Sequence, residues 1–326
     1  MTLRIVTAKD VRALLTMERA IELMREAMAL VGRNETTQPL RSALWLPDKR
    51  GLLGLMPGYV ASPERLGVKV LTVMPSNFTK GLPSHQGMVL LFNTESGAPE
   101  AIIDAQSVTA IRTAAATAVA TDVLARGDAK TLAFFGYGEQ AETHVEALRR
   151  VRAFERLLLW GRDAAKAAAF AKHHSSAALP IEAVASAEEA ASRADVICTL
   201  TAAIDPVLFG RWLRPGTHVN AVGSGTPREA ELDIDAIKLS RMFADNRDGV
   251  LGQCGEFLRA KAAGAVEDAH VLGSVGDVII GKIAGRQSAD EITLFKSLGM
   301  AVEDLVSCEF ILAEAARRGV GQSIAW

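Results

Sequence analysis

The sequence has few cysteines and no long uninterrupted apolar run. Its three cysteines, Cys198, Cys254 and Cys308, are odd in number and widely separated, whereas a small disulfide-stapled secreted domain carries a dense, even set. No stretch approaches the roughly 18 to 20 continuous apolar residues of a membrane helix, and the first residues lack the apolar core of a signal peptide. We therefore expect a soluble, cytoplasmic protein without a membrane partner.

The sequence also has little net charge, because 36 basic residues nearly balance 38 acidic ones. No basic run or basic-aromatic stripe stands out that could neutralise several phosphates in a row, so nucleic acid is not an expected partner. The six histidines are scattered, apart from the adjacent His173 and His174, and neither an HxxxH nor a CxxC spacing occurs. We expect no metal site.

A chain of 326 residues, 49% of them hydrophobic, is long enough for two globular domains. Residues 7–32 carry apolar residues three and four apart and predict two helices, with Thr7 and Thr16 as N-caps. Residues 40–103 are β-rich and broken by turns, which predicts an antiparallel or mixed sheet. The Ala/Thr-rich segment that follows predicts a long helix ending at Gly127.

From Lys130 on, short apolar strands alternate with helical segments until about Asn246. This order is typical of a parallel sheet with helices on both faces. Residues 291–319 are amphipathic, and we expect a helix that packs back on the N-terminal domain.

The motif GYGEQA, at residues 136–141, is the strongest local signal, because it follows the strand-like TLAFF and precedes a helical segment. In a Rossmann turn the first glycine (Gly136) makes the bend, the second (Gly138) lets a pyrophosphate approach, and a small residue (Ala141) lets helix and strand pack closely. We predict dinucleotide binding, with a purely structural turn as the alternative. The predicted cofactor site further includes residues at the helix start and at two later strand ends: Glu139, Gln140, Thr199, Thr201 and Val222.

The end of the second strand bears on the choice of cofactor. In NAD enzymes an acidic side chain there usually binds the ribose 2'-hydroxyl. Here the strand runs into Arg162 and Asp163. Arg162 suits a 2'-phosphate, and we expect Asp163 to cap the next helix. NADP(H) is therefore the preferred cofactor; if Arg162 is only a solvated surface charge, NAD(H) binds as well.

Three cations, Arg41, Lys69 and Arg112, stand among apolar or small residues of the N-terminal part. Charged residues are seldom buried without a partner, so each alone could be a paired structural cation. If the three converge, they suit an anionic small-molecule substrate such as an amino or imino acid carboxylate, to which arginine donates with two N–H groups.

Arg41 is followed, in order, by the motifs MPGY, GVKVLT, IRTAAATAVA, GYGEQA, GSGTPREAELD and ITLFKSLGMAVEDL. Together these elements resemble the ornithine cyclodeaminase/mu-crystallin family over essentially the whole chain. The resemblance implies a Rossmann-fold doubly wound parallel sheet, residues 116–299, inserted into an α+β substrate-binding and dimerisation domain, residues 1–115 and 300–326. It also implies a homodimer, with Arg41, Lys69 and Arg112 binding the substrate carboxylate and Lys69 near the reacting carbon.

One position departs from the cyclodeaminases of this family, whose aspartate after the fifth Rossmann strand handles the substrate amine. The matching residue here is Gly225, so the expected base for deamination is missing. Ketimine reductases of the family receive their substrate as an imine and need no such base; Lys69 or water would support the imine nitrogen. His85, in PSHQGMVLL, is either a second polar group near the substrate or a hydrogen-bonded turn residue.

The leading interpretation is NAD(P)H-dependent reduction of a cyclic imino acid, Δ1-pyrroline-2-carboxylate or Δ1-piperideine-2-carboxylate, to proline or pipecolate. The alternatives are an ornithine cyclodeaminase that uses another base, an alanine-type amino acid dehydrogenase, and a non-catalytic mu-crystallin-like binding protein. The presence of all three cations argues against the last of these.

Overall fold

The computed structural model describes residues 2–326, except for the side chains of residues 78 and 79. The chain divides into two compact units. The first comprises Met1–Arg112 and Gly299–Trp326, and the second comprises Thr113–Leu298. Helix α3 (Ala105–Leu124) carries the chain from the first unit into the second.

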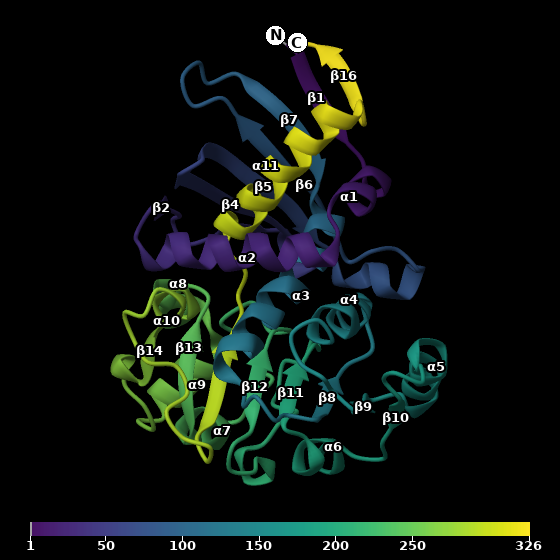
Figure 1. Cartoon of the computed structure of the whole chain (residues 1–326), viewed down its shortest axis with the longest axis vertical. Helices are drawn as coiled ribbons and strands as arrows, with labels where there is room; N and C mark the ends of the chain where they lie inside the picture. Colours follow the sequence, from purple (N-terminus) through teal and green to yellow (C-terminus); the bar gives the residue numbers. More distant parts are fainter. Residues whose placement is uncertain (1) are drawn as a thin grey trace. The chain divides into compact units, whose positions relative to one another are not determined.

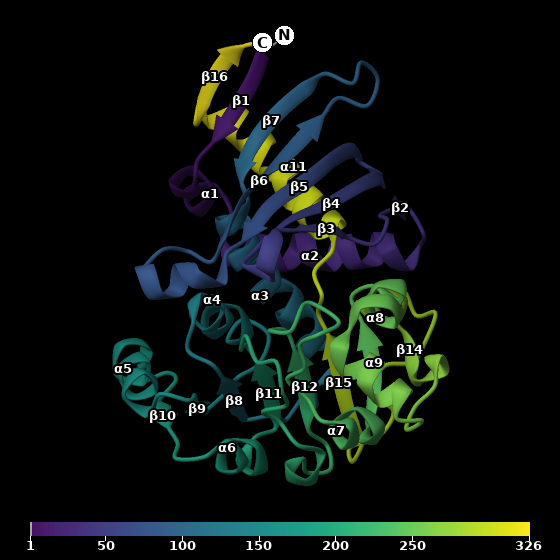
Figure 2. The same cartoon turned by 180° about the vertical axis from the view of Figure 1, so that it is seen from behind.

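The first unit contains a mixed sheet, which confirms the prediction for residues 40–103. Its order is β16-β1-β7-β6-β5-β4-β2, with β3 also paired to β4; β1 and β7 are parallel and the other neighbours antiparallel. Pairing of β1 with β16 brings the two ends of the chain side by side (Figures 1 and 2). The strands are β1 (Thr2–Val6), β2 (Thr36–Thr37), β3 (Ser42–Trp45), β4 (Leu52–Ala61), β5 (Glu64–Val73), β6 (His85–Phe92), β7 (Pro99–Asp104) and β16 (Gln322–Ala325).

Three helices of the first unit are α1 (Ala8–Leu14), α2 (Met17–Gly32) and α11 (Ala301–Arg318), and short 3-10 turns span Pro47–Lys49 and Pro75–Lys80. Thr7 and Thr16 cap α1 and α2, as predicted. Helix α11 crosses β4 and β5 beside α2 (Figure 1). Its close approach depends on glycine, because a Cβ on Gly58 would lie 2.8 Å from the Cβ of Ala301.

The second unit contains a sheet whose neighbouring strands are all parallel, in the order β10-β9-β8-β11-β12-β15-β13-β14. Every residue of β8, β11 and β12, at its centre (Figure 2), is buried, so both faces are covered. This is the predicted Rossmann-type doubly wound sheet. The strands are β8 (Thr131–Phe135), β9 (Arg156–Trp160), β10 (Ile181–Ala183), β11 (Val196–Thr199), β12 (His218–Ala221), β13 (Ser240–Ala244), β14 (Val271–Ser274) and β15 (Ile292–Lys296).

The helices of this unit connect successive strands. They are α4 (Glu139–Leu148), α5 (Ala164–His174), α6 (Ala187–Arg193), α7 (Ile234–Leu239), α8 (Arg247–Gln253), α9 (Gly255–Ala262) and α10 (Val275–Ile279), with 3-10 turns at Gly210–Trp212 and Asp268–His270.

The prediction for residues 291–319 was wrong in its first part. Residues 292–296 form β15, which lies between β12 and β13 in the sheet, so the strands are not complete by Asn246. A strand inside the sheet is buried on both faces, so ITLFK lacks the apolar–polar alternation of a half-buried strand and cannot be told from a buried helix segment by periodicity. Gly299, with φ of +80°, then separates the strand from α11.

The predicted helix end at Gly127 was also wrong, because α3 ends at Leu124. An arginine takes the place of a glycine cap: Nη2 of Arg152 donates to the carbonyl oxygen of Asp122 at 2.7 Å, in the last turn of the helix.

Over residues 2–326, no helix combines the length and apolar character needed to span a membrane. Nor do His, Cys, Asp and Glu side chains within that range gather in threes as a metal site would require. All three cysteines are buried and free.

Candidate functional site

A buried group of opposite charges lies in the first unit and joins β5, α3 and the start of α11. We call it the charged cluster: Lys69, Thr109, Arg112, Glu303 and Asp304. Nζ of Lys69 donates to Oγ1 of Thr109 at 2.6 Å and to Oδ1 of Asp304 at 3.3 Å. The same Oδ1 accepts Nε of Arg112 at 3.0 Å, and Nη1 of Arg112 donates to Glu303 at 2.8 Å. The cluster therefore pairs two cations with two carboxylates.

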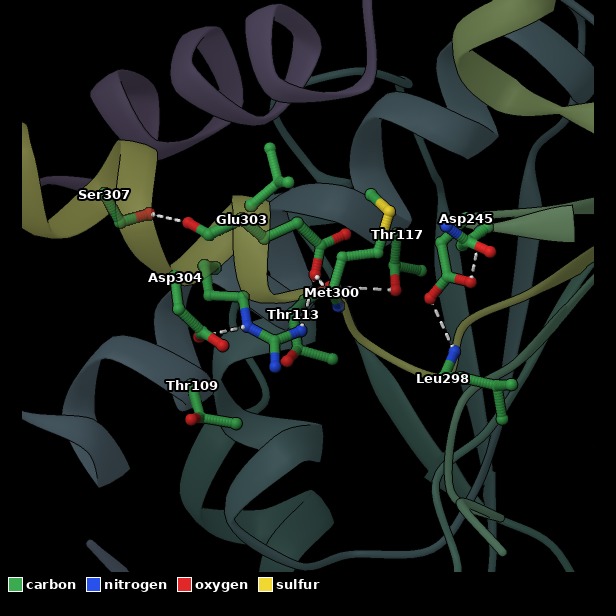
Figure 3. A network of polar contacts seen from close by, with 12 residues as sticks. Thr109, Thr113, Thr117, Asp245, Leu298, Met300, Glu303, Asp304 and Ser307 are labelled. Atoms are coloured by element: carbon green, nitrogen blue, oxygen red, sulfur yellow. Dashed lines mark hydrogen bonds and ion pairs between the residues drawn. The ribbon is translucent and has the colours of Figure 1, made fainter. Parts of the chain in front are cut away.

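The beginning of α11 holds both acids in place. Glu303 and Asp304 are neighbours in its first turn (Figure 3). The carboxylate of Glu303 also accepts the backbone N–H of Met300 at 3.1 Å, and its carbonyl oxygen accepts the hydroxyl of Ser307 at 2.8 Å (Figure 3). A Cβ on Gly299 would lie 2.9 Å from Nη2 of Arg112, so glycine leaves room for the guanidinium.

Burial makes Lys69 sensitive to its neighbours. Lys69 is 4% exposed, and this burial lowers the pKa of its ammonium group to about 8. The negative charge of Asp304 opposes the lowering, and the positive charge of Arg112 strengthens it. An ammonium group has three N–H donors, of which Thr109 and Asp304 accept two. The arrangement thus offers a third donor and a proton that is held at neutral pH but can be released slightly above it.

Of the four predicted catalytic residues, the hydrogen bonds bring together Lys69 and Arg112. Arg41 lies directly before β3 and is half-buried. His85 begins β6, is exposed, and has Nδ1 2.9 Å from Oγ of Ser84. Pairing of Lys69 with Val89 and of Val73 with His85 puts His85 on the same sheet face, roughly 13 Å along the strands from Lys69. Roles for Arg41 and His85 at the substrate stay predictions.

Sequence reasoning missed Thr109, Glu303 and Asp304. The acids fall inside the motif ITLFKSLGMAVEDL. Two adjacent acids within the apolar run AVEDLV are the signal that was available, because acids on a buried helix face need cations.

In the second unit, the glycine turn after β8 fits a dinucleotide. Gly136 has φ of +116°, and a Cβ there would lie 2.7 Å from the carbonyl oxygen of Leu200, after β11. The sheet order reverses between β8 and β11, which is where doubly wound sheets bind nucleotides. Gly138 caps α4, and a Cβ on it would meet no atom within 4 Å, so the helix start borders open space. Ala141, in the first turn of α4, is fully buried.

Arg162 and Asp163 follow β9 directly, after Gly161. Arg162 is exposed. Asp163 accepts the N–H of Lys166 at 3.1 Å and so caps α5, as predicted. Gly161 packs against Tyr137 of the glycine turn, since a Cβ there would lie 2.1 Å from the tyrosine ring.

The other predicted cofactor residues lie at helix and strand ends. Glu139 and Gln140 open α4. Thr199 ends β11, but its side chain is fully buried and donates to Glu231 at 2.8 Å, so it can offer a cofactor only backbone atoms. Thr201 also bonds Glu231, through both its N–H and its hydroxyl at 2.7 Å. The N–H of Val222 donates to the carbonyl oxygen of Thr199 at 3.1 Å.

Gly225 lies in the loop after β12. Its N–H donates to Oε2 of Glu229 at 2.9 Å, and the N–H of Thr226 donates to the same oxygen at 3.1 Å. The nearby carboxylate of Glu229 is thus used to hold the loop, and position 225 itself offers no base.

Known proteins share this fold over their full length. A Δ1-pyrroline-2-carboxylate reductase of Bacillus cereus is 36% identical over 322 residues, which cover 98% of this chain and 99% of that protein. The structure of Thermococcus litoralis Δ1-pyrroline-2-carboxylate reductase in complex with NADH and L-proline is 34% identical, with a TM-score of 0.95 and coverage of 98% of this chain and 100% of that one. An archaeal alanine dehydrogenase dimer with bound NAD is 31% identical, with a TM-score of 0.92 and complete coverage of both chains.

The expected resemblance is confirmed by a family model that matches residues 2–319. Its match spans both compact units, including the charged cluster and the glycine turn. The chain belongs to the ornithine cyclodeaminase/mu-crystallin family.

Proposed function

We propose that this protein is an oxidoreductase that uses a reduced nicotinamide cofactor to reduce the C=N bond of a cyclic imino acid, Δ1-pyrroline-2-carboxylate or Δ1-piperideine-2-carboxylate, to L-proline or L-pipecolate. One observation carries the proposal: Asp304 accepts hydrogen bonds from both Arg112 and the buried ammonium of Lys69, which has a third N–H donor left for a substrate. The names of the Bacillus and Thermococcus relatives support the same reaction.

In this proposal the cations of the charged cluster bind the substrate carboxylate, with Arg41 as a third ligand. When bound, a reduced nicotinamide would supply a hydride for the imine carbon, and the imine nitrogen, to which the π electrons of C=N move, would take a proton from the Lys69 ammonium or from water. Lys69 donates a hydrogen bond to the imine nitrogen or to the carboxylate, and Asp304 favours its protonated form. His85 is the further polar group proposed near the substrate.

The second unit is proposed as the NAD(P)-binding domain and the first as the substrate-binding and dimerisation domain. Gly138 would let the pyrophosphate approach the backbone, while Gly136 makes the bend and Ala141 lets α4 pack on the sheet. Glu139 and Gln140, at the start of α4, would lie beside the pyrophosphate. Exposed Arg162 supports a preference for NADP(H) over NAD(H), because it follows β9 where NAD enzymes usually have an acid.

A cyclodeaminase is the less favoured reaction. Gly225 stands where the cyclodeaminases of the family have their aspartate, and Glu229, the next acid along the loop, holds two backbone N–H groups instead. Deamination of L-ornithine would therefore require another base.

We propose that the protein is a homodimer joined through the outer face of the first unit's sheet. Leu55, Val70 and Met88 are aligned across β4, β5 and β6 on this face, and Leu55 and Met88 are 38% and 42% exposed. Leu44 and Leu66 are exposed by 66% and 41%. Apolar side chains in such a row are typical of a surface that another protein covers, and the dimer of the alanine dehydrogenase relative supports a two-fold partner.

A panel of substrates tests the proposed reaction. Purified protein is mixed with NADPH or NADH and either cyclic imino acid, with pyruvate and ammonia, or with L-ornithine and oxidised cofactor, and products are identified by mass spectrometry. The proposal expects L-proline or L-pipecolate from the imino acids. Turnover of pyruvate and ammonia alone would instead support an alanine-type dehydrogenase.

A further inference from the structure

Glu231 is a fully buried carboxylate of the second unit that joins two loops. Its Oε1 accepts both the N–H and the hydroxyl of Thr201 at 2.7 Å. Its Oε2 accepts the hydroxyl of Thr199 at 2.8 Å, the N–H of Gly223 at 2.7 Å and the N–H of Ser224 at 3.2 Å. One side chain therefore ties the chain that leaves β11 to the chain that leaves β12.

The buried ion pair of Lys296 and Glu256 contacts the backbone of Glu231. Nζ of Lys296, at the end of β15, donates to Oγ and to the carbonyl oxygen of Ser224 at 2.6 and 2.8 Å, and lies 3.4 Å from Oε1 of Glu256. That oxygen also accepts the backbone N–H of Glu231 at 3.0 Å. Since β12 lies between β11 and β15, the carboxyl ends of three adjacent strands are connected.

The donors around Glu231 require an acceptor. Burial raises its pKa, whereas the charge of Lys296 and the hydrogen bonds from Thr201 oppose that rise. Three of its donors are backbone N–H groups, which cannot accept a hydrogen bond from a protonated carboxyl group. The ionised carboxylate, which only accepts hydrogen bonds, therefore fits the site best. The two loops also touch directly, because a Cβ on Gly223 would lie 2.1 Å from the carbonyl oxygen of Thr201.

A doubly wound sheet binds a dinucleotide across its switch point, with one mononucleotide half on each side. The glycine turn after β8 serves one half, and the loops after β11 and β12 belong to the other. We propose that Glu231 is a positioning residue that holds residues 199–201 and 222–224 in the conformation that receives the nicotinamide half of the cofactor. This inference rests on the proposed function, since it presumes a dinucleotide ligand.

The test is to titrate the Glu231→Gln variant of the full chain with NADH and, separately, with ADP, which lacks the nicotinamide half. The amide keeps the shape of the carboxylate but places N–H donors against N–H donors. We expect the dissociation constant for NADH to rise by about tenfold or more and that for ADP to stay within about twofold of the unmodified protein.

Asp195→Asn is the matched control. The carboxylate of Asp195 also accepts backbone N–H groups, from Lys130 and Thr131 at 2.9 Å, but at the opposite edge of the sheet, where β8 begins. Its change to an amide lowers stability without reaching either loop, and we expect NADH and ADP binding to be preserved. Thr199→Val provides a milder second variant if Glu231→Gln does not fold: it removes one donor to Glu231 from a side chain too buried to touch the cofactor.

The outcomes separate the inference from the proposed function. Selective loss of NADH affinity in Glu231→Gln or Thr199→Val supports a positioning role. Equal losses for NADH and ADP, or no loss for either, would overturn it. If the unmodified protein binds neither NADH nor NADPH, the proposed function fails and the inference with it.

Discussion

Lys69 and Asp304 form a buried ion pair in which the same carboxylate oxygen, 3.3 Å from Nζ of Lys69, also accepts Nε of Arg112 at 3.0 Å. One atom of α11 therefore holds both cations that we propose for the substrate carboxylate. A change at Asp304 should alter the protonation of Lys69 without removing either cation.

The Asp304→Asn variant should lose activity at a lower pH than the unmodified protein. If catalysis needs charged Lys69, activity falls as the pH rises past its pKa of about 8. Asp304 raises that pKa, while burial and Arg112 lower it, so loss of the negative charge moves the falling limb to lower pH. The measurement is kcat/KM across roughly pH 6 to 10. Glu309→Gln, which changes an acid of α11 paired with Arg65, is the control and should leave the limb in place. If kcat/KM of Asp304→Asn falls at the same pH as that of the unmodified protein, Lys69 is not the titrating group.

Replacement of Gly138 by valine should abolish cofactor binding while the fold survives. The structure has room for the new side chain, because a Cβ there meets nothing within 4 Å, but that space is where the pyrophosphate is proposed to lie. Nucleotide titration and thermal denaturation measure the two effects. Gly127→Val is matched to it, since Gly127 also faces open space and lies outside the proposed site. Undiminished binding by Gly138→Val would remove the glycine turn from the cofactor site.

Arg162→Ala should weaken NADPH binding more than NADH binding, by about 1.5 to 3 kcal/mol for the loss of a charge-assisted contact. Exposed Lys166, in the first turn of α5, provides the control: Lys166→Ala removes a nearby positive charge and should affect both cofactors alike. Isothermal titration with each cofactor checks the difference. Equal losses in Arg162→Ala would show that this residue does not contact the 2'-phosphate.

Leu66→Asp should convert the proposed dimer into a monomer. The substitution places a charge on the outer face of the sheet, where Leu66 is 41% exposed, and desolvation of that charge opposes association. Light scattering at micromolar concentration measures the mass. Leu239→Asp alters a leucine of the second unit that is 55% exposed, and it should leave the dimer intact. A monomeric unmodified protein would contradict the proposal directly.

Much of the fold was predictable because its elements carry local signals. Caps at Thr7 and Thr16, the turn at Gly136 and the cap at Asp163 depend on neighbouring residues, and the structure has all four. Strand β15 was missed because its place in the sheet depends on strands far away in the sequence. Strand β1 was missed as well, since its pairing partners β7 and β16 are equally distant.

The candidate site was only partly predictable. Isolated cations in apolar segments pointed to Lys69 and Arg112, and these two are joined in the structure. Their partner Asp304 lies more than half the chain away, and only folding of α11 onto the sheet brings it to them. For the same reason Glu231 appeared in the sequence only as part of a motif, although its carboxylate receives donors from two separate loops.

In the proposed reaction, hydride passes from the cofactor to the imine carbon of a cyclic imino acid. It is tested most directly by incubating the protein with Δ1-pyrroline-2-carboxylate or Δ1-piperideine-2-carboxylate and a reduced nicotinamide cofactor that carries deuterium at the transferred position. The proposed reaction predicts L-proline or L-pipecolate with deuterium on the α-carbon, and no ammonia from L-ornithine in a parallel reaction. Product without deuterium, or rapid conversion of L-ornithine to L-proline with release of ammonia, would contradict it.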